Sequence, residues 1–193
     1  MVKIHLPLYA PAKPNAPPPP SHRTLKTTMP EHAPILPVIA AEVAALAPGF
    51  RALSLTVEAA PIVRPEIADR AVERACQALA RGEPDWAEAH LAAWAEAFRR
   101  FGAKPQRTPC SAEALRKRAL RDGGLPSIDP VVDLYNAISV QFAIPVGGEN
   151  LAAYAGTPRL VVADGSETFD TLKNGEAVDE SPDPGEVVWR DDL

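Results

Sequence analysis

The chain has 193 residues, a net charge of −5 and 46% hydrophobic residues. This composition is typical of a globular domain of ordinary size. Its two cysteines exclude a disulfide framework and a CxxC metal site, and no apolar run is long enough to span a bilayer. We expect a cytoplasmic protein with no metal, no cofactor and no membrane partner.

Proline is dense in residues 1–35, where it includes the run Pro17–Pro20. Proline fixes φ and removes an amide donor, so we expect a disordered, extended tail there and a single domain over 36–193. Charge is unevenly distributed, with +6 over residues 99–122 and −10 over 123–193. The basic stretch is therefore a candidate for binding phosphate, with a solvated helix face as the alternative.

The first half of the globular part predicts a helix, a strand and two further helices. A short helix is expected over 37–49, followed by a half-buried strand over 51–59 in which apolar and polar residues alternate strictly. Helices are expected over 64–82 and 84–102, each ended by a glycine. The second carries His90 in an aromatic stripe, where a core-edge histidine bonded to a neighbour is more typical than a catalytic base.

The basic stretch includes a helix expected over 111–124, with Ser111 as its N-cap. Cations in and before this helix are the candidates for contacts with phosphate. They are Arg100, Lys104, Arg107, Arg116, Lys117, Arg118 and Arg121. Cys110 lies beside the N-cap in a basic setting, but no base that would make it a nucleophile is evident.

A helix over 130–142, capped by Asp129, has apolar residues almost all round, which predicts burial on most sides. Asp133 and Asn136 share one face of it. They need hydrogen-bond partners, because burying a polar group without one costs about 1–3 kcal/mol. Either the backbone of the Gly147–Gly148 turn or a bound ligand can supply those partners.

The end of the chain predicts β structure. A strand is expected over 158–164, a hairpin over 167–180 that turns at Asn174 and Gly175, and a final strand over 185–192. Helices followed by β-rich sequence favour an α+β fold over regular βαβ alternation.

Four blocks of the sequence, taken together and in order, carry a family resemblance. They are FGAKPQRTPCSAEALRKRAL, GGLPSIDPVVDLYNAISVQFAIPVGGENL, ETF and GEVVWRDD. They resemble the tRNA-binding and editing module of the β subunit of phenylalanyl-tRNA synthetase, and especially its freestanding single-domain relatives in bacteria. The resemblance implies mixed β-sheets in a sandwich-like arrangement flanked by helices. It also implies a pocket that hydrolyses mischarged aminoacyl-tRNA, with tRNA and not DNA as the partner.

Position by position, the resemblance implies a catalytic site at Gly147, Gly148 and Glu149. The glycine amides can hold an oxyanion, and the carboxylate can bind the amino group or orient water. The substrate-binding or supporting positions are Asp133, Asn136 and Glu167. The relatives continue beyond the WRDD block, so we expect a truncated domain that lacks its last segment.

Two other functions fit the sequence. One is a non-catalytic RNA-binding or interaction module, and the other is a protein that binds a free amino acid or small metabolite, which suits the acidic overall charge. The chain lacks the ATP-binding motifs of a complete synthetase. The sequence does not indicate which amino acid or tRNA is the substrate, or the oligomeric state.

Overall fold

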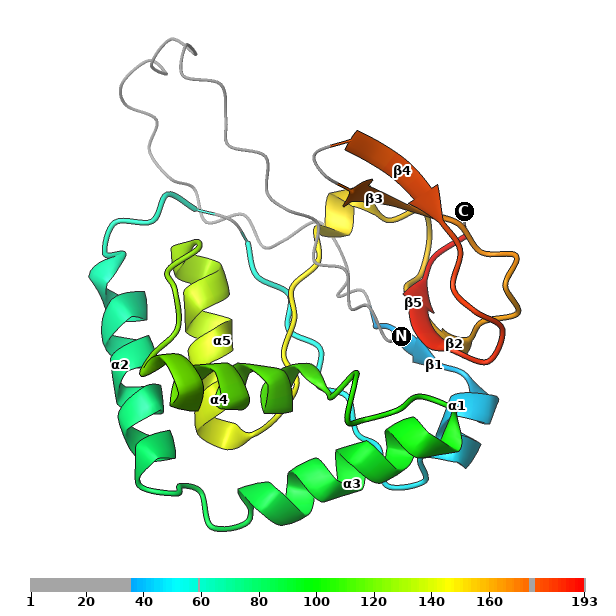
Figure 1. The fold of residues 1–193 in the computed structure, drawn as a ribbon. Helices are drawn as coiled ribbons and strands as arrows, with labels where there is room; N and C mark the ends of the chain where they lie inside the picture. The colour runs from blue at the N-terminus through cyan, green and yellow to red at the C-terminus, as the bar shows by residue number, and fades with distance from the viewer. Residues whose placement is uncertain (1–35, 59, 174–175, 193) are drawn as a thin grey trace, which may run out of the picture.

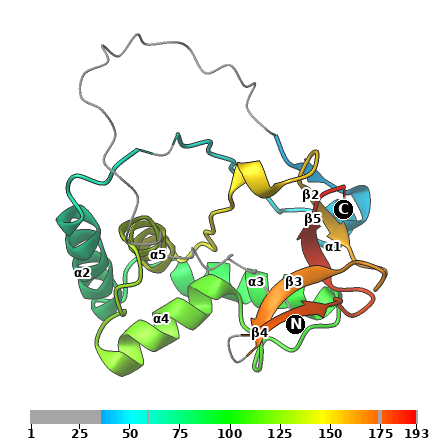
Figure 2. The same cartoon turned by 90° about the horizontal axis from the view of Figure 1, so that it is seen from above.

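The computed structural model describes residues 36–58, 60–173 and 176–192. The helices in those residues are α1 (Ala41–Leu46), α2 (Glu66–Ala80), α3 (Ala87–Arg100), α4 (Ser111–Asp122), α5 (Pro130–Phe142) and the 3₁₀ turn η1 (Leu151–Ala153). The strands are β1 (Val38–Ile39), β2 (Arg159–Val162), β3 (Phe169–Lys173), β4 (Glu176–Glu180) and β5 (Val187–Arg190). The predicted tail lies outside the described residues. Figures 1 and 2 show α2, α4 and α5 grouped on one side of the molecule, and the strands with α1 on the other.

One hydrophobic cluster holds α2, α4 and α5 together. Its buried residues are Ala75, Leu79, Ala119, Ala137 and Val140. Alanine at three of these positions lets the helix axes approach closely, because interaxial distance depends on the side chains at the contact. The helices predicted over 64–82 and 130–142 are thus confirmed, and the structure shows that they pack on each other.

A second cluster joins α3 to the start of α4 and contains Leu91, Phe98 and Cys110. The rings along α3 meet edge to face, with 5.7 Å between the centroids of Trp86 and His90. Trp94 Nε1 donates a hydrogen bond of 3.1 Å to His90 Nε2. The prediction of a histidine bonded to a neighbour at the core edge is therefore confirmed.

The described strands form two small sheets. The first has the order β1–β2–β5, with β1 parallel and β5 antiparallel to β2, and the second is the β3–β4 hairpin. The predicted hairpin is confirmed, while its turn residues Asn174 and Gly175 lie outside the described residues. Apart from β1, the helices precede the strands along the chain, and no regular βαβ alternation is present among the described residues, so the α+β class is confirmed.

The helix predicted over 37–49 begins later than expected, because its first residues join a sheet. Val38 N donates to Pro158 O at 2.9 Å, and Ala40 N donates to Leu160 O at 3.0 Å. Val38 and Ile39 are β-branched and meet the open edge of β2, which gives their backbone partners that a first helical turn would leave unsatisfied.

The strand predicted over 51–59 is absent from its described residues, 51–58. Leu53, Leu55 and Val57 are 86%, 78% and 82% exposed. No backbone hydrogen bond links residues 51–58 to any other described residue. Alternation predicts a strand only where a second strand edge and a covering layer are present, and the described part of the chain supplies neither here.

The prediction that α5 is buried on most sides is also wrong. Val131, Leu134, Ile138 and Phe142 follow one another at helical spacing and are 38–58% exposed. The other side of α5 packs on α2 and α4. Asp129 caps the helix as predicted, since its Oδ1 accepts from Val131 N at 2.9 Å.

Ser111 is not the N-cap of α4. Cys110 holds that position in extended conformation, and Ser111 is the first helical residue. The Ser111 hydroxyl is buried without a hydrogen-bond partner among the described residues. Burial raises the pKa of the Cys110 thiol, which disfavours the thiolate and agrees with an inert cysteine.

Candidate functional site

The end of α5 directs the chain toward the predicted Gly147–Glu149 site. Ala143 ends the helix in the left-handed region at φ 49°, a position where glycine is more usual. Ser139 Oγ donates a hydrogen bond of 2.6 Å to Ile144 O, which fixes the turn from the preceding helical residues. The following loop therefore leaves α5 in a defined direction.

The glycine pair lies against an aromatic ring. A Cβ built on Gly148 would stand 3.6 Å from Tyr135 Cε1, so the backbone there runs beside the ring of a residue on α5. The backbone N–H groups of Gly147 and Gly148 donate to no residue in the described part of the chain. Both predicted oxyanion donors are thus unengaged.

Glu149 follows the pair and makes neither a hydrogen bond nor an ion pair with any described residue. It is exposed at the loop surface, yet partial desolvation raises the pKa of its carboxyl. Asn150 then caps the single turn η1, accepting from Ala152 N at 3.1 Å, and Tyr154 ends that turn. Glu149 and Tyr154 therefore flank one 3₁₀ turn.

Tyr135 and Tyr154 were not predicted as site residues. Desolvation, and after it the charges of Glu149 and Asp191, raise the pKa of Tyr154 to about 12. Desolvation also raises the pKa of Tyr135, followed by the charges of Asp129, Glu149 and Asp133. Both side chains are therefore neutral phenols at physiological pH. Tyr135 has no signal of its own in the sequence, because only the turn at the end of α5 brings Gly148 back to it.

Asp133 does not hydrogen-bond to the backbone of the Gly147–Gly148 turn, so that predicted partner is wrong for this residue. Its Oδ2 accepts from Ser127 Oγ at 2.7 Å and its Oδ1 accepts from Ile128 N at 2.9 Å. Both donors precede α5, because the loop before the helix folds back over its first turn. Asp133 thus holds the loop that enters α5, not the loop that leaves it.

The other two supporting positions differ from each other. Asn136 is partly buried, and its side chain has no hydrogen-bond partner among residues 36–58, 60–173 and 176–192. Glu167 is engaged, because it accepts from Gly165 N at 3.0 Å and from Arg190 Nη1 at 3.2 Å. Glu167 ties the turn after β2 to β5, which leaves its carboxylate little capacity for a ligand.

The prediction that Arg116 contacts phosphate is wrong. It is buried, and its Nη1 donates to Val140 O at 2.6 Å while both terminal nitrogens reach Glu83 O at 3.3 Å. Desolvation lowers its pKa. The sequence pattern failed here because a cation in a basic run can face inward when backbone carbonyls are there to receive it.

The remaining predicted cations are exposed, but most have a carboxylate partner on their own helix. Arg100 pairs with Glu96 at 3.6 Å and Lys117 with Glu113 at 2.6 Å. Asp122 pairs with two further arginines of α4, with Arg118 at 3.7 Å and with Arg121 at 2.7 Å. Exposed pairs of this kind contribute only about 0–1 kcal/mol, so phosphate can displace them.

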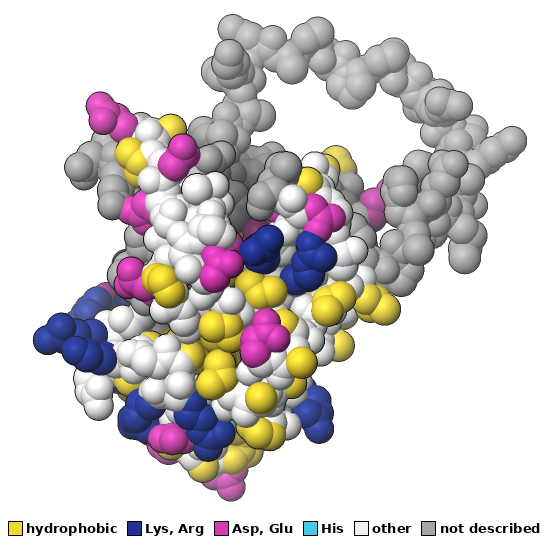
Figure 3. All heavy atoms as spheres, turned by 90° about the vertical axis from the view of Figure 1, so that its right-hand side faces the viewer, with side chains coloured by type: hydrophobic (Ala, Val, Ile, Leu, Met, Phe, Trp, Pro, Cys, Tyr) yellow, Lys and Arg dark blue, Asp and Glu magenta, His cyan; other side chains and the backbone are white. Residues whose placement is uncertain are grey.

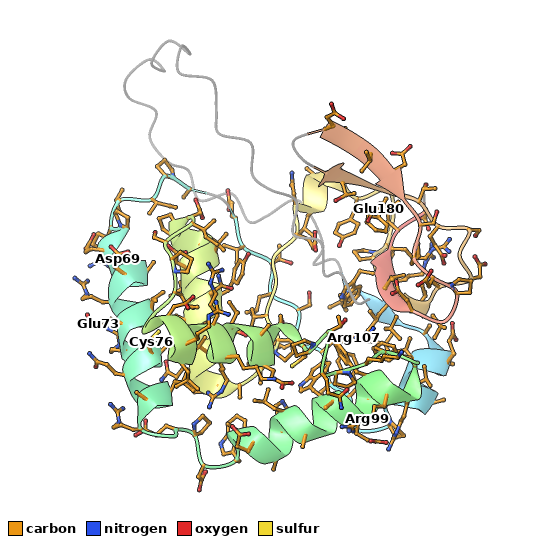
Figure 4. The ribbon with its side chains drawn as sticks, viewed as in Figure 1. Asp69, Glu73, Cys76, Arg99, Arg107 and Glu180 are labelled. Atoms are coloured by element: carbon orange, nitrogen blue, oxygen red, sulfur yellow. The ribbon has the colours of Figure 1, made fainter. Side chains whose placement is uncertain are left out.

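Lys104 and Arg107 lie on the segment between α3 and α4 and are exposed without an ion pair to any described residue. Figure 4 shows Arg107 with Arg99 on the strand side of the molecule, away from Asp69 and Glu73 of α2. The face that carries α1 and the sheet mixes basic, acidic and hydrophobic side chains (Figure 3). Lys104 and Arg107 are thus the two cations of the predicted phosphate-binding set without an ion pair to a described residue.

Two cavities lie elsewhere. One of about 490 Å³ is lined by α2 residues that include Asp69, Glu73 and Cys76, by the loop over 123–127 and by Asp133. Another of about 130 Å³ lies beside β5 and the end of β4. Neither is lined by the Gly147–Glu149 loop.

Two classes of feature are absent from the described residues. No three histidine, cysteine or carboxylate side chains there come together as a metal site. No described helix is long and apolar enough to cross a membrane.

The family model for the B3/4 domain matches residues 93–193, which is just over half of the chain. The chain belongs to the B3/4 domain family. This is the domain family of the phenylalanyl-tRNA synthetase β subunit, so the B3/4 assignment confirms the resemblance and identifies a tRNA-synthetase-related nucleic-acid-binding module. No curated protein and no solved structure matches the chain.

The B3/4 match begins within α3 and includes the segment with Lys104 and Arg107, the Gly147–Glu149 loop and Tyr154. It excludes α2, and with it one wall of the larger cavity. The Gly147–Glu149 loop, Lys104 and Arg107 thus all lie in the matched part. The larger cavity, by contrast, is lined partly by α2 residues outside the match.

Proposed function

We propose that this B3/4 domain binds aminoacylated tRNA in the cytoplasm and hydrolyses the ester of mischarged tRNA in trans. The observation that carries the proposal is the state of the loop within the matched residues. Two glycine amides there have no acceptor, and the carboxylate of Glu149 next to them has no donor or cation among the described residues. Groups without partners on a family's matched loop are suited to meeting a ligand.

The chemistry needs a nucleophilic water and donors for the oxyanion. Water attacks the ester carbonyl, and the oxyanion that forms accepts hydrogen bonds from the amides of Gly147 and Gly148. The tetrahedral intermediate then expels the ribose oxygen, which takes a proton, and leaves a free amino acid and a free tRNA. Glu149 can take the proton of the attacking water or bind the amino group of the substrate.

The raised pKa of Glu149 is consistent with either role. A carboxylate whose pKa moves toward ambient pH is a better proton acceptor than an ordinary surface glutamate. The same partial desolvation strengthens its attraction for a cation. Whether Glu149 accepts the proton of water or binds the amino group depends on its surroundings, which include Tyr135 and Tyr154.

In this proposal, the segment between α3 and α4 binds the tRNA phosphates. Lys104 and Arg107 have no carboxylate partner among the described residues, so they lose no existing contact when they meet a phosphate. Arg100, Lys117, Arg118 and Arg121 exchange weak exposed pairs for phosphate contacts. A local cluster of this kind offsets the overall charge of −5 near the RNA.

A panel of tRNAs, each charged with a non-cognate amino acid, tests the proposal. Wild type is compared with Glu149→Ala and Asn136→Ala, and with Glu42→Ala on exposed α1 as the matched control. We expect hydrolysis of at least one ester, a loss of about tenfold or more in Glu149→Ala, and no change in the control. If no ester is hydrolysed but tRNA binds in a salt-dependent way, the result supports the non-catalytic RNA-binding alternative. If there is neither hydrolysis nor tRNA binding, the small-molecule alternative is left.

A further inference from the structure

The loop that carries Glu149 runs from beside the ring of Tyr135 on α5 to Tyr154 at the end of η1. The ring of Tyr135 on α5 lies beside the backbone of Gly148, and Tyr154 follows Glu149 across the single turn η1. Ala155 N donates to Asp191 Oδ2 at 2.9 Å, which ties the end of β5 to the residue after Tyr154. The loop is therefore held beside α5 at Gly148 and to the end of β5 at Ala155.

The hydroxyl groups of Tyr135 and Tyr154 have no hydrogen-bond partner within the described residues. Each ring is only partly buried, so a ligand can reach it from solvent. Glu149 is likewise unpaired with any described residue. Each of the three polar groups is therefore open to a ligand, and the charge of Glu149 acts on both phenols.

The charges that act on these phenols all have the same sign. Tyr135 experiences Asp129, Glu149 and Asp133, and Tyr154 experiences Glu149 and Asp191. No lysine or arginine among the described residues contributes to either ring. The site is therefore electronegative, and the faces of its aromatic rings add further attraction for a cation.

A substrate of the proposed function has one group that matches these properties. The α-ammonium of an aminoacyl ester is a small cation that can pair with a carboxylate and lie on an aromatic face. An acylated α-nitrogen carries no charge and is bulkier, so it loses both interactions.

We propose that Tyr135, Glu149 and Tyr154 form an ammonium-recognition site, so that this domain selects ligands with a free α-amino group. The inference rests on the proposed function, because it names the part of the substrate that the same site holds. It assigns Glu149 to pairing with the ammonium, and it assigns the faces of the two tyrosine rings to binding the same cation.

The test uses amino acid amides, which are not esters and report binding alone. The amides of alanine, serine, phenylalanine and tyrosine are each compared with their N-acetyl forms by calorimetry on the full chain. At least one free amide should bind about tenfold more tightly than its N-acetyl form. That preference should decline as pH rises through about 8, where an α-amino group loses its proton.

Variants separate recognition from folding. Glu149→Gln and Tyr154→Leu should reduce the preference to less than about threefold, whereas Tyr154→Phe keeps the ring and should keep the preference. Circular dichroism confirms that each variant is folded. Equal binding of the N-acetyl amides, a preference that survives Glu149→Gln, or no binding of any amide overturns the inference.

Deacylation measured in parallel keeps this inference distinct from the proposed function. If mischarged tRNA is hydrolysed equally well with a free or an N-acetylated α-nitrogen, the proposed function stands and the ammonium site is wrong. If free amides bind preferentially while no ester in the panel is hydrolysed, the ammonium site stands and the hydrolase is wrong. For an active ester, Glu149→Gln should raise KM more than it lowers kcat.

Discussion

Arg116 Nη1 in α4 donates a hydrogen bond of 2.6 Å to the carbonyl oxygen of Val140 in α5. The same guanidinium reaches the carbonyl oxygen of Glu83, between α2 and α3, at 3.3 Å. One side chain thus connects three parts of the helical side of the molecule. A residue in the middle of the basic stretch therefore holds the fold together and does not face RNA.

Arg116→Met should lower the free energy of unfolding by about 2–4 kcal/mol, because it leaves buried carbonyl groups without a donor. Arg118→Met is the matched control, since Arg118 is exposed and Asp122 is its one ion-pair partner among the described residues. It should change stability by less than about 1 kcal/mol. Urea denaturation measures both. A stable Arg116→Met protein with weakened tRNA binding would return Arg116 to the RNA interface.

Lys104→Gln with Arg107→Gln should weaken tRNA binding, because these cations have no competing ion pair among the described residues. We expect a loss of about tenfold near physiological salt, and a slope of log K against log salt that is smaller by about 1.5–2. Filter binding over a salt series measures both quantities. Arg64→Gln with Arg74→Gln removes the same charge outside the basic stretch, and an equal effect from that control would show only nonspecific attraction.

Tyr154 should lose its phenolic proton at a higher pH than an ordinary tyrosine. Its pKa of about 12 lies above that of an ordinary tyrosine, partly because of the charge of Glu149. Glu149→Gln should therefore shift the last phase of an ultraviolet titration at 295 nm to lower pH, and Tyr154→Phe should remove that phase. Glu176→Gln, far along the chain in β4, is the control. A titration insensitive to Glu149→Gln would separate the two residues in space.

Stability should depend on pH through Glu149 with a defined sign. Its pKa is raised in the folded state, so folding favours the protonated form. That stabilisation is fully present below the unfolded pKa and is lost as pH rises through the folded pKa. Wild type should therefore lose stability relative to Glu149→Gln between acidic and neutral pH. Denaturant unfolding at a series of pH values checks this, and a difference that grows in favour of wild type would contradict it.

Leu55→Ser should change the free energy of unfolding by less than about 0.5 kcal/mol, because Leu55 is exposed in the segment over 51–58. Leu160→Ser, at the buried position of β2, should cost about 2–5 kcal/mol. Thermal denaturation of both variants compares the two positions. A large loss in Leu55→Ser would show that the segment is covered in solution.

Local signals were sufficient for most of the helices. Asp129 and Pro130 mark the start of α5, and Gly82 and Gly102 take up the left-handed conformation just past α2 and α3. Caps and glycines act through bonds within a few residues, so they can be identified without the rest of the fold. The α+β class follows from the same order of elements.

The strands were less predictable because each requires a partner. The alternating segment over 51–58 remains unpaired with any described residue, whereas Val38 and Ile39 form a strand because β2 lies beside them. The exposed side of α5 is a similar case, since apolar residues all round a helix predict burial only where neighbours are present to cover each side.

The sequence by itself determined the existence and order of the main helices, the family and the loop that carries Gly147, Gly148 and Glu149. Only the tertiary structure decided what stands beside that loop. It turned Asp133 toward Ser127, buried Arg116 against Val140, and brought Tyr135 next to Gly148. The reason is that a helix cap depends on neighbours in sequence, whereas the partner of a side chain depends on how distant segments meet.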